Sequence, residues 1–273
     1  MLGCEKNMKT RIISAIIMCL IAVPLLLIGG LPFKIFIVVL GVMSMYEIMN
    51  IRKKKKEIPI GIRILSYILI ATFVYLGTNV YSSNYEIIYK IITVIFLIYF
   101  IPVVFINDTE KYNATDALYV LGSTIFLAIA YNSCVLISNT NISYLIYILL
   151  VTIATDTFAY FTGYFIGEHK LCVKISPKKT WEGAIGGSFI ATIIATVFYI
   201  FIIDSSTNIF LVILITLLLT IVGQIGDLFF SSIKRHFNVK DFSNLIPGHG
   251  GILDRFDSVI FVILTYILFM NIL

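Results

Sequence analysis

Long apolar runs separated by short polar connections repeat along the whole of this 273-residue chain. A transmembrane helix needs about 20 consecutive, mostly apolar residues, and nine runs approach that length. They cover residues 12–30, 32–50, 60–80, 88–107, 116–138, 142–167, 183–203, 207–230 and 258–273. The pattern predicts an all-α, polytopic integral membrane protein with about nine transmembrane helices.

Composition supports this prediction. Hydrophobic residues make up 59% of the chain and charged residues 13%, with a mean hydropathy of +1.01, which excludes a water-soluble globular protein. No polar linker is visible, so we expect residues 1–273 to form a single integral membrane domain. The first apolar run has no small-residue cleavage site and should remain in the protein. Four scattered cysteines without CxxC spacing argue against a disulfide framework or a zinc site.

Basic residues cluster in alternate connections, notably at 52–56, 168–182 and 231–257. By the positive-inside rule, the N-terminus and both large polar loops face the cytoplasm. The Arg-Lys-Lys-Lys-Lys run at 52–56 is best explained as a topology determinant, while a contact with anionic lipid stays open as an alternative. We expect the helices of residues 1–140 to be less directly tied to the site than residues 142–273, which carry the polar motifs.

The first polar motif begins inside the eighth apolar run. Asp227, Ser231 and Lys234 are spaced i, i+4 and i+7, so a continuing helix places them on one face, and Arg235 follows. A carboxylate about one turn inside an apolar run is costly, so Asp227 should face a wet cavity or a cation.

A glycine-rich loop follows, with Lys240 and Asp241 before Pro247-Gly248-His249-Gly250-Gly251. Its backbone N–H groups can approach an anion closely. Asp254, Arg255 and Asp257 then open the last apolar run. Hard cations such as Mg²⁺ prefer carboxylate and phosphate oxygens, which Asp227 and Asp254 could supply from adjacent helix ends. His249 is either an acid–base group or a hydrogen-bond donor to phosphate.

A second polar motif runs from Asp156, inside the sixth apolar run, to Gly187. An acid in lipid is a functional hypothesis by default, although a structural, hydrogen-bonded role for Asp156 remains open. Gly163 and Gly167 form a GxxxG pair suited to close helix packing. Trp181 could stack on a base or anchor at the membrane interface, and the anchor is favoured. The loop between Gly167 and Trp181 carries ammonium and hydroxyl groups suited to binding phosphate. They belong to Ser176, Lys178, Lys179 and Thr180.

These motifs together resemble a known family signature. The pattern Ser231-x-Ile233-Lys234-Arg235, Lys240-Asp241 and Pro247-x-His249-Gly250-Gly251-x-x-Asp254-Arg255-x-Asp257 is similar to that of the phosphatidate cytidylyltransferase family, also called CDP-diacylglycerol synthase. Asp156 and the stretch 176–183 are similar to further family motifs. The N-terminal half matches in hydropathy only.

The resemblance implies a nucleotidyltransferase of phospholipid biosynthesis that converts CTP and phosphatidate to CDP-diacylglycerol and pyrophosphate. It implies Mg²⁺, a possible second, monovalent cation such as K⁺, a homodimer in a bacterial inner membrane, and no nucleic-acid partner. Asp227 and Asp254 resemble the metal-binding acids, with Asp257 close by.

Two groups of residues are thus candidates for the site. The catalytic candidates are Asp227, Asp254, Lys234, Arg235 and His249. The candidates for substrate binding are Asp156, Ser176, Lys178, Lys179, Thr180, Ser231, Lys240, Asp241, Gly250, Gly251 and Arg255. Because phosphatidate is already ionised, no strong base is needed, and His249 is better interpreted as a binding residue.

Two alternatives stay open. A secondary transporter for an anionic solute would also contain intramembrane acids and glycine-broken helices, but it gives no reason for two basic, glycine-rich loops on one face. A different CTP-using membrane enzyme, such as a CTP-dependent lipid-alcohol kinase or an archaeal-type CDP-lipid synthase, would share the chemistry of the loops.

Overall fold

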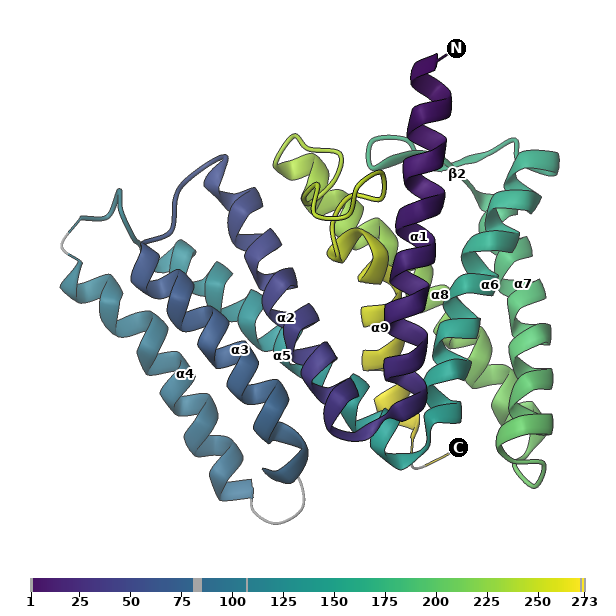
Figure 1. Ribbon diagram of the computed structural model, residues 1–273, viewed down its shortest axis with the longest axis horizontal. Coiled ribbons are helices and arrows are strands. Elements are labelled where there is room, and N and C mark those ends of the chain that lie inside the picture. Colours follow the sequence, from purple (N-terminus) through teal and green to yellow (C-terminus); the bar gives the residue numbers. More distant parts are fainter. Residues whose placement is uncertain (1, 81–84, 107, 271, 273) are drawn as a thin grey trace. The chain divides into compact units, whose positions relative to one another are not determined.

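The computed structural model describes residues 2–80, 85–106, 108–270 and 272, with side chains outside 2–9, 77–80 and 85–89. The predicted runs 88–107 and 258–273 reach residues 107, 271 and 273, which lie outside the described residues. Within the described part, the chain forms nine α-helices (Figure 1). They are α1 (Leu2–Ile28), α2 (Gly30–Lys53), α3 (Ile60–Val80), α4 (Tyr85–Phe105), α5 (Ala114–Thr140), α6 (Ile142–Ile166), α7 (Trp181–Phe198), α8 (Ile209–His236) and α9 (Leu253–Phe269).

Six helices in the described part are long and apolar enough to cross a membrane. They are α1, α2, α5, α6, α8, and α7 together with the π-helical turn that follows it, η1 (Tyr199–Ile203). The all-α, multi-pass membrane architecture is therefore confirmed. The count of nine crossings is not, because the apolar stretches of α3 and α4 are shorter, at Ile60–Leu76 and Lys90–Phe105, and α9 has 17 residues.

Helix boundaries follow from local sequence. Asn141, Thr180 and Asn208 each stand just before a helix and accept a hydrogen bond from a backbone N–H of its first turn, which caps α6, α7 and α8. The turn between α1 and α2 falls at Gly29 and Gly30, whose φ angles of 63° and 56° suit glycine.

The basic loop between α6 and α7 contains a small antiparallel hairpin, a feature that the helical prediction did not include. Strand β1 (Lys170–Cys172) pairs with β2 (Ser176–Thr180), with Lys170 opposite Thr180 and Cys172 opposite Ser176. Because side chains alternate along a strand, Lys178 and Lys179 point to opposite faces of the hairpin.

The chain divides into two compact units. Unit 1 comprises residues 1–136 and 241–252, and unit 2 comprises residues 137–240 and 253–273. The polar motifs are thus divided, with the glycine-rich loop in unit 1 and the acids of α6, α8 and α9 in unit 2. The single membrane domain of residues 1–273 stays a prediction.

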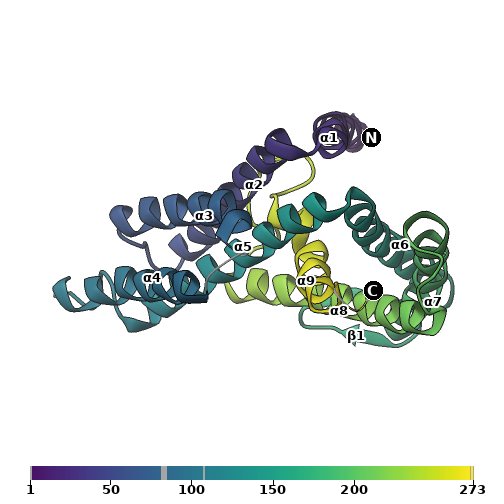
Figure 2. The ribbon, with the colours of Figure 1, turned by 90° about the horizontal axis from the view of Figure 1, so that it is seen from below.

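In unit 2, α7 lies beside both α6 and α8, and α8 lies beside α9 (Figure 2). Small residues permit the close approach of α6 and α7: a Cβ on Gly187 would lie 2.7 Å from Cβ of Ala159, and one on Gly163 would lie 3.5 Å from Cα of Gly183. The predicted packing role of Gly163 is confirmed. Gln224 of α8 donates to Ser188 Oγ of α7 at 2.7 Å, so a polar bond joins these two apolar helices.

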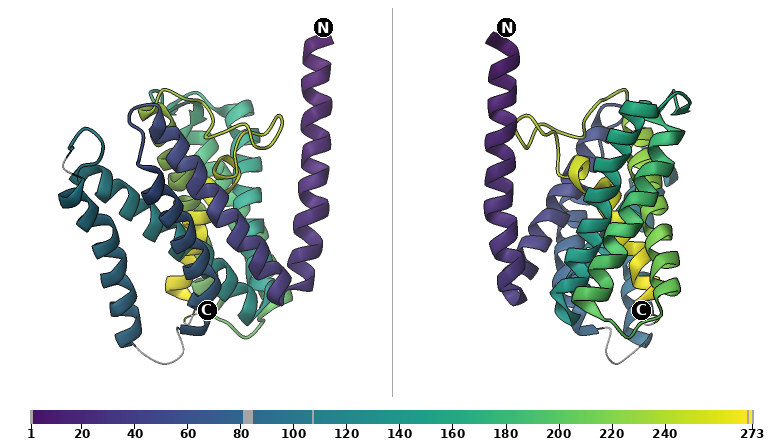
Figure 3. Two further views of the ribbon diagram at one scale, coloured as in Figure 1. Left: turned by 60° about the vertical axis from the view of Figure 1, so that its left-hand side comes forward. Right: turned by 90° about the vertical axis from the view of Figure 1, so that its right-hand side faces the viewer.

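In unit 1, buried hydroxyl groups join the helices. Tyr99 of α4 bonds to Ser66 of α3 at 2.9 Å and to Thr124 of α5 at 2.8 Å. Ser44 of α2 bonds to Tyr131 of α5 at 2.5 Å. The segment 241–252, drawn in olive and yellow in Figure 3, contacts α1 and α2. Those contacts bring the glycine-rich loop into this unit.

Candidate active site

Two acid–lysine pairs dominate unit 2. Asp227 of α8 pairs with Lys179 of β2, with 2.5 Å between Oδ2 and Nζ. Asp254 at the start of α9 pairs with Lys234 of α8 at 2.7 Å, and both of these residues are buried. Ion pairs are needed here because an unpaired charge is costly in an apolar environment. Asp227 and Asp254, two of the three predicted metal-binding acids, therefore each lie against a lysine that the sequence also placed in the site.

The predicted polar face of α8 is confirmed. Ser231 Oγ donates to Asp227 Oδ1 at 3.3 Å, one turn away, and Lys234 reaches Asp254 from the same helix. Ser231 and Lys234 are both buried. Arg235 lies at the end of the helix, where it donates to the carbonyl groups of Ile175 and Val239, at 3.2 and 3.0 Å. Arg235 thus ties the hairpin to the end of α8.

Three carboxylates of unit 2 come from three different helices. Asp156 of α6, Asp227 of α8 and Asp257 of α9 repel one another electrostatically. Ser258 joins two of the helices: its hydroxyl lies 3.5 Å from Asp156 Oδ2, while its backbone N–H donates to Asp257 Oδ1 at 2.9 Å. Three acids near one another within apolar helices are a costly arrangement, which a bound cation would relieve.

The donor chemistry of this site fits a divalent cation. Carboxylate and hydroxyl oxygens are the ligands that Mg²⁺ prefers. Among the residues that the structure describes, no three Asp, Glu, His or Cys side chains already converge as a metal cage. Asp227 and Asp254 are instead neutralised by lysine ammonium groups. The arrangement suits a cation that arrives with further ligands of its own, such as nucleotide phosphates.

The hairpin places its polar side chains differently. Thr180 is buried, and its hydroxyl oxygen accepts from Gly183 N at 3.1 Å, so it caps α7. Lys178 is exposed on the opposite face from Lys179, and Ser176 is partly exposed. Trp181 is exposed at the start of α7. The binding roles of Ser176, Lys178, Lys179 and Thr180 stay predictions.

The glycine-rich loop of unit 1 is a tight turn. Ile246 and Gly250 pair across it, with Ile246 N donating to Gly250 O at 2.8 Å. Gly248 and Gly250 adopt φ angles of 79° and 82°, which favour glycine strongly. Lys240 and Asp241, at the start of the loop, are exposed, and so is Arg255, just after it. These three residues are accessible to a ligand from solvent.

Helix α1 contacts the tip of this loop. Arg11 Nε donates to Gly248 O at 2.9 Å, and Ser14 Oγ lies 2.7 Å from His249 Nδ1. Ser14 has a single hydroxyl hydrogen, so it donates either to Arg11 O at 3.0 Å or to Nδ1, depending on the tautomer of His249.

Glu47 is a residue that sequence reasoning missed. It lies in α2, fully buried, and its Oε1 accepts from Ser243 Oγ at 2.6 Å and from Ile252 N at 2.8 Å. The available signal was a lone carboxylate inside an apolar run, the same signal that singled out Asp156.

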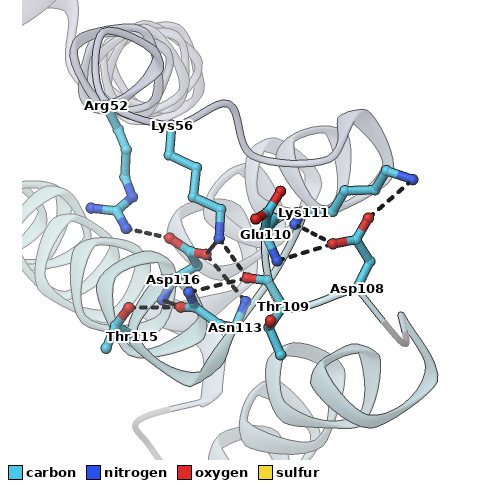
Figure 4. A network of polar contacts seen from close by, with 9 residues as sticks. All are labelled: Arg52, Lys56, Asp108, Thr109, Glu110, Lys111, Asn113, Thr115 and Asp116. Atoms are coloured by element: carbon cyan, nitrogen blue, oxygen red, sulfur yellow. Dashed lines mark hydrogen bonds and ion pairs between the residues drawn. The ribbon is translucent and has the colours of Figure 1, made fainter.

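The basic run at 52–56 has structural partners. Arg52 and Lys56 both point at the buried Asp116 of α5, as Figure 4 shows, and Lys56 Nζ lies 2.5 Å from Oδ2. Asp116 and Asn113 also cap α5 reciprocally. Nearby, the hydrogen bond from Lys111 lowers the pKa of Asp108. Arg52 of α2 and Lys56, which follows that helix, thus connect this part of the chain to α5.

Comparison with known proteins bears on all of these residues. Residues 9–273 match the Cytidylyltransferase family. Proteins named phosphatidate cytidylyltransferase from Staphylococcus haemolyticus and Staphylococcus aureus are 37% and 35% identical over 256 and 257 residues, which is 94% of this chain and 96% of each relative. One from Staphylococcus epidermidis is 36% identical over 257 residues, with the same shares.

The chain belongs to the cytidylyltransferase family. The family resemblance carried by the motifs of residues 231–257 is thereby confirmed, and the chain is a nucleotidyltransferase. The cytidylyltransferase match begins at residue 9, so it includes the helices that carry Arg11, Ser14 and Glu47 as well as the acids of unit 2. Similarity therefore extends to the N-terminal half, where the sequence motifs offered only hydropathy.

The Lys234–Asp254 pair allows stability and activity to be separated. Replacing either residue alone, as in Lys234→Met or Asp254→Leu, leaves a buried unpaired charge and should lower the free energy of unfolding by roughly 3–5 kcal/mol. The double variant, which replaces the pair by apolar side chains, should recover most of that loss. Thermal unfolding in detergent measures it.

Activity should not recover with stability. If both residues serve the reaction, the double variant stays inactive although it is folded. A double variant as active as the wild type would contradict the assignment of either residue to the site.

Proposed function

We propose that this chain is a phosphatidate cytidylyltransferase, which forms CDP-diacylglycerol and pyrophosphate from CTP and phosphatidate in phospholipid biosynthesis. The observation that carries the proposal is similarity over 94% of the chain to relatives of that name, at 35–37% identity. The lysine-paired acids of unit 2 and the exposed basic residues of the loops fit a reaction between two anions.

The reaction requires little covalent chemistry from the protein. A phosphate oxygen of phosphatidate attacks the α-phosphorus of CTP, a new P–O bond forms, and the bond to the β-phosphate oxygen breaks to release pyrophosphate. Phosphatidate is ionised at neutral pH, so no side chain has to remove a proton. Catalysis then depends on positioning and on neutralising charge.

The cationic side chains of the chain supply that neutralisation. Lys179 and Lys234 already stand against carboxylates, and either could exchange its acid for a phosphate oxygen at small electrostatic cost. The exposed basic residues can meet phosphates directly: Lys178, Arg235, Lys240 and Arg255. Because phosphatidate is already ionised and no proton has to be removed, His249 fits a binding role better than a role as the essential base.

Mg²⁺ belongs to this proposal as the cofactor, with a monovalent cation such as K⁺ as a second ion. Asp227 and Asp254 would hold the divalent ion, with Asp257 near, and the ion would supply charge stabilisation to the α-phosphate and the leaving pyrophosphate. Lys179 and Lys234 would keep these acids compensated before the nucleotide arrives.

The setting of the enzyme follows from the distribution of charge. We infer a cell (inner) membrane location with the N-terminus and the catalytic loops in the cytoplasm, where CTP is available, because the basic connections alternate along the chain. A homodimer is part of the same proposal, and small-residue helix faces are compatible with it.

The proposed reaction is tested with purified protein in detergent, CTP labelled at the α-phosphorus, phosphatidate and Mg²⁺. Label should enter the lipid, and omission of Mg²⁺ should abolish the transfer. A CTP-dependent kinase would transfer only the γ-phosphate and leave the lipid unlabelled. Solute uptake by proteoliposomes without turnover would support a transporter instead.

The metal-binding role of Asp227 predicts a specific loss. Asp227→Asn should reduce the rate by about 100-fold or more, because one oxygen ligand loses its charge, and residual activity should need more Mg²⁺. Rates are measured across a Mg²⁺ titration, with Glu110→Gln, an exposed loop acid, as the control. Wild-type rates with an unchanged Mg²⁺ dependence in Asp227→Asn would remove the assignment.

The hairpin offers a matched pair of lysines. Lys178→Ala should raise the KM for CTP roughly 10-fold, equivalent to about 1.4 kcal/mol, with a smaller effect on kcat, since it removes one phosphate-binding charge. Lys174, exposed in the turn of the same hairpin, gives the control variant Lys174→Ala. If both variants shift the KM equally, general surface charge is responsible and Lys178 has no specific contact.

A further inference from the structure

Glu47 binds both ends of the segment that carries the glycine-rich loop. Its Oε1 accepts from the Ser243 hydroxyl, near the start of the segment, and from the Ile252 N–H at its end. Ser243 Oγ in turn accepts from Leu245 N at 3.2 Å. One carboxylate oxygen thereby closes a loop of ten residues, 243–252, within unit 1.

The carboxylate also accounts for the second glycine of the Gly-Gly pair. A Cβ on Gly251 would lie 2.7 Å from both the carboxyl carbon and Oε2 of Glu47, closer than real Cβ contacts come. Gly250 is favoured by its φ of 82°, whereas a side chain at position 251 would force the Glu47 carboxylate to move away from its hydrogen-bond donors. The two glycines are therefore explained by different constraints, backbone conformation at Gly250 and side-chain space at Gly251.

Burial of this acid is informative because it is costly. Glu47 is fully buried in α2, an apolar membrane-spanning helix. A buried carboxylate is tolerated where hydrogen bonds to the charged form offset its loss of hydration, and such bonds are about twice as strong as neutral ones. An apolar residue at this position of α2 would span the membrane at lower cost. The acid is therefore better explained by the loop that it binds.

We propose that Glu47 is a positioning residue, which fixes the loop of residues 243–252 so that His249 and Gly250 can meet the substrate phosphates. This role rests on the proposed cytidylyl transfer. Ile252, which Glu47 binds, stands two residues before Asp254 in the chain, so the same contact constrains the backbone that leads into the catalytic acids. Glu47 itself acts through the loop and takes no part in the chemistry.

The test compares Glu47→Ala with Ser44→Ala. Ser44 is also fully buried, one turn earlier on α2, but its hydroxyl bonds to Tyr131 of α5. Amide hydrogen exchange of the peptide covering residues 241–252 should quicken in Glu47→Ala and stay unchanged in Ser44→Ala. Exchange is measured on the full-length protein in detergent and does not require activity.

Kinetics per folded enzyme provide the second measurement. Glu47→Ala should lower kcat on the order of 100-fold, as expected for displaced catalytic groups, while Ser44→Ala lowers the melting temperature without changing kcat or KM. Glu47→Gln, which keeps an acceptor oxygen for Ser243 and Ile252, should recover much of the rate.

A steric cycle completes the experiment. Gly251→Ala alone should lose activity because its methyl group meets the Glu47 carboxylate, and Glu47→Ala combined with Gly251→Ala should be no worse than either single variant. Fully additive losses would contradict the contact.

The outcomes separate this inference from the proposed function. Suppose that the wild type transfers no label to lipid, but amide exchange of the loop still quickens in Glu47→Ala. The reaction assignment then fails, while the role of Glu47 in holding the loop stands. If label is transferred and Glu47→Ala matches the wild type in exchange or in kcat, the positioning role is overturned while the reaction assignment stands.

Discussion

Carboxylates in an apolar chain must be compensated where they lie, and this constraint organises the polar structure of the protein. Three buried acids meet it in three ways. Asp116 is held by two cations, Asp254 by one lysine, and Glu47 accepts hydrogen bonds from a hydroxyl and a backbone N–H. Each solution joins segments distant in sequence, because the compensating group comes from another element. The positions of the acids therefore determine which helices and loops are joined.

Compensation by lysine has a chemical consequence for the site. An ammonium paired with a carboxylate is already desolvated and oriented, and it can pass to a phosphate oxygen when a cation takes over the acid. Lys179 and Lys234 stand in this relation to Asp227 and Asp254. In the proposed reaction, these two pairs keep Asp227 and Asp254 compensated before either anionic substrate arrives.

The helices and the polar face of α8 could be predicted from the sequence because both depend on the periodicity of apolar and polar residues. Asp227, Ser231 and Lys234 follow the helical repeat within two turns. Other contacts could not. The partner of Asp254 could have been any of several lysines, and only packing selects Lys234. The partners of Glu47 lie 196 and 205 residues away, a separation over which local pattern carries no information. Thr180 suited phosphate by composition, yet its hydroxyl caps α7.

The contact between Glu47 and Gly251 also bears on how such sequences can change. Any side chain at position 251 meets the carboxylate, and any shorter residue at position 47 leaves Ser243 and Ile252 without their acceptor. A change at either position alone therefore disturbs this contact, although 203 other residues separate the two in the chain. In related sequences, a residue larger than glycine at position 251 should occur where position 47 is no longer acidic.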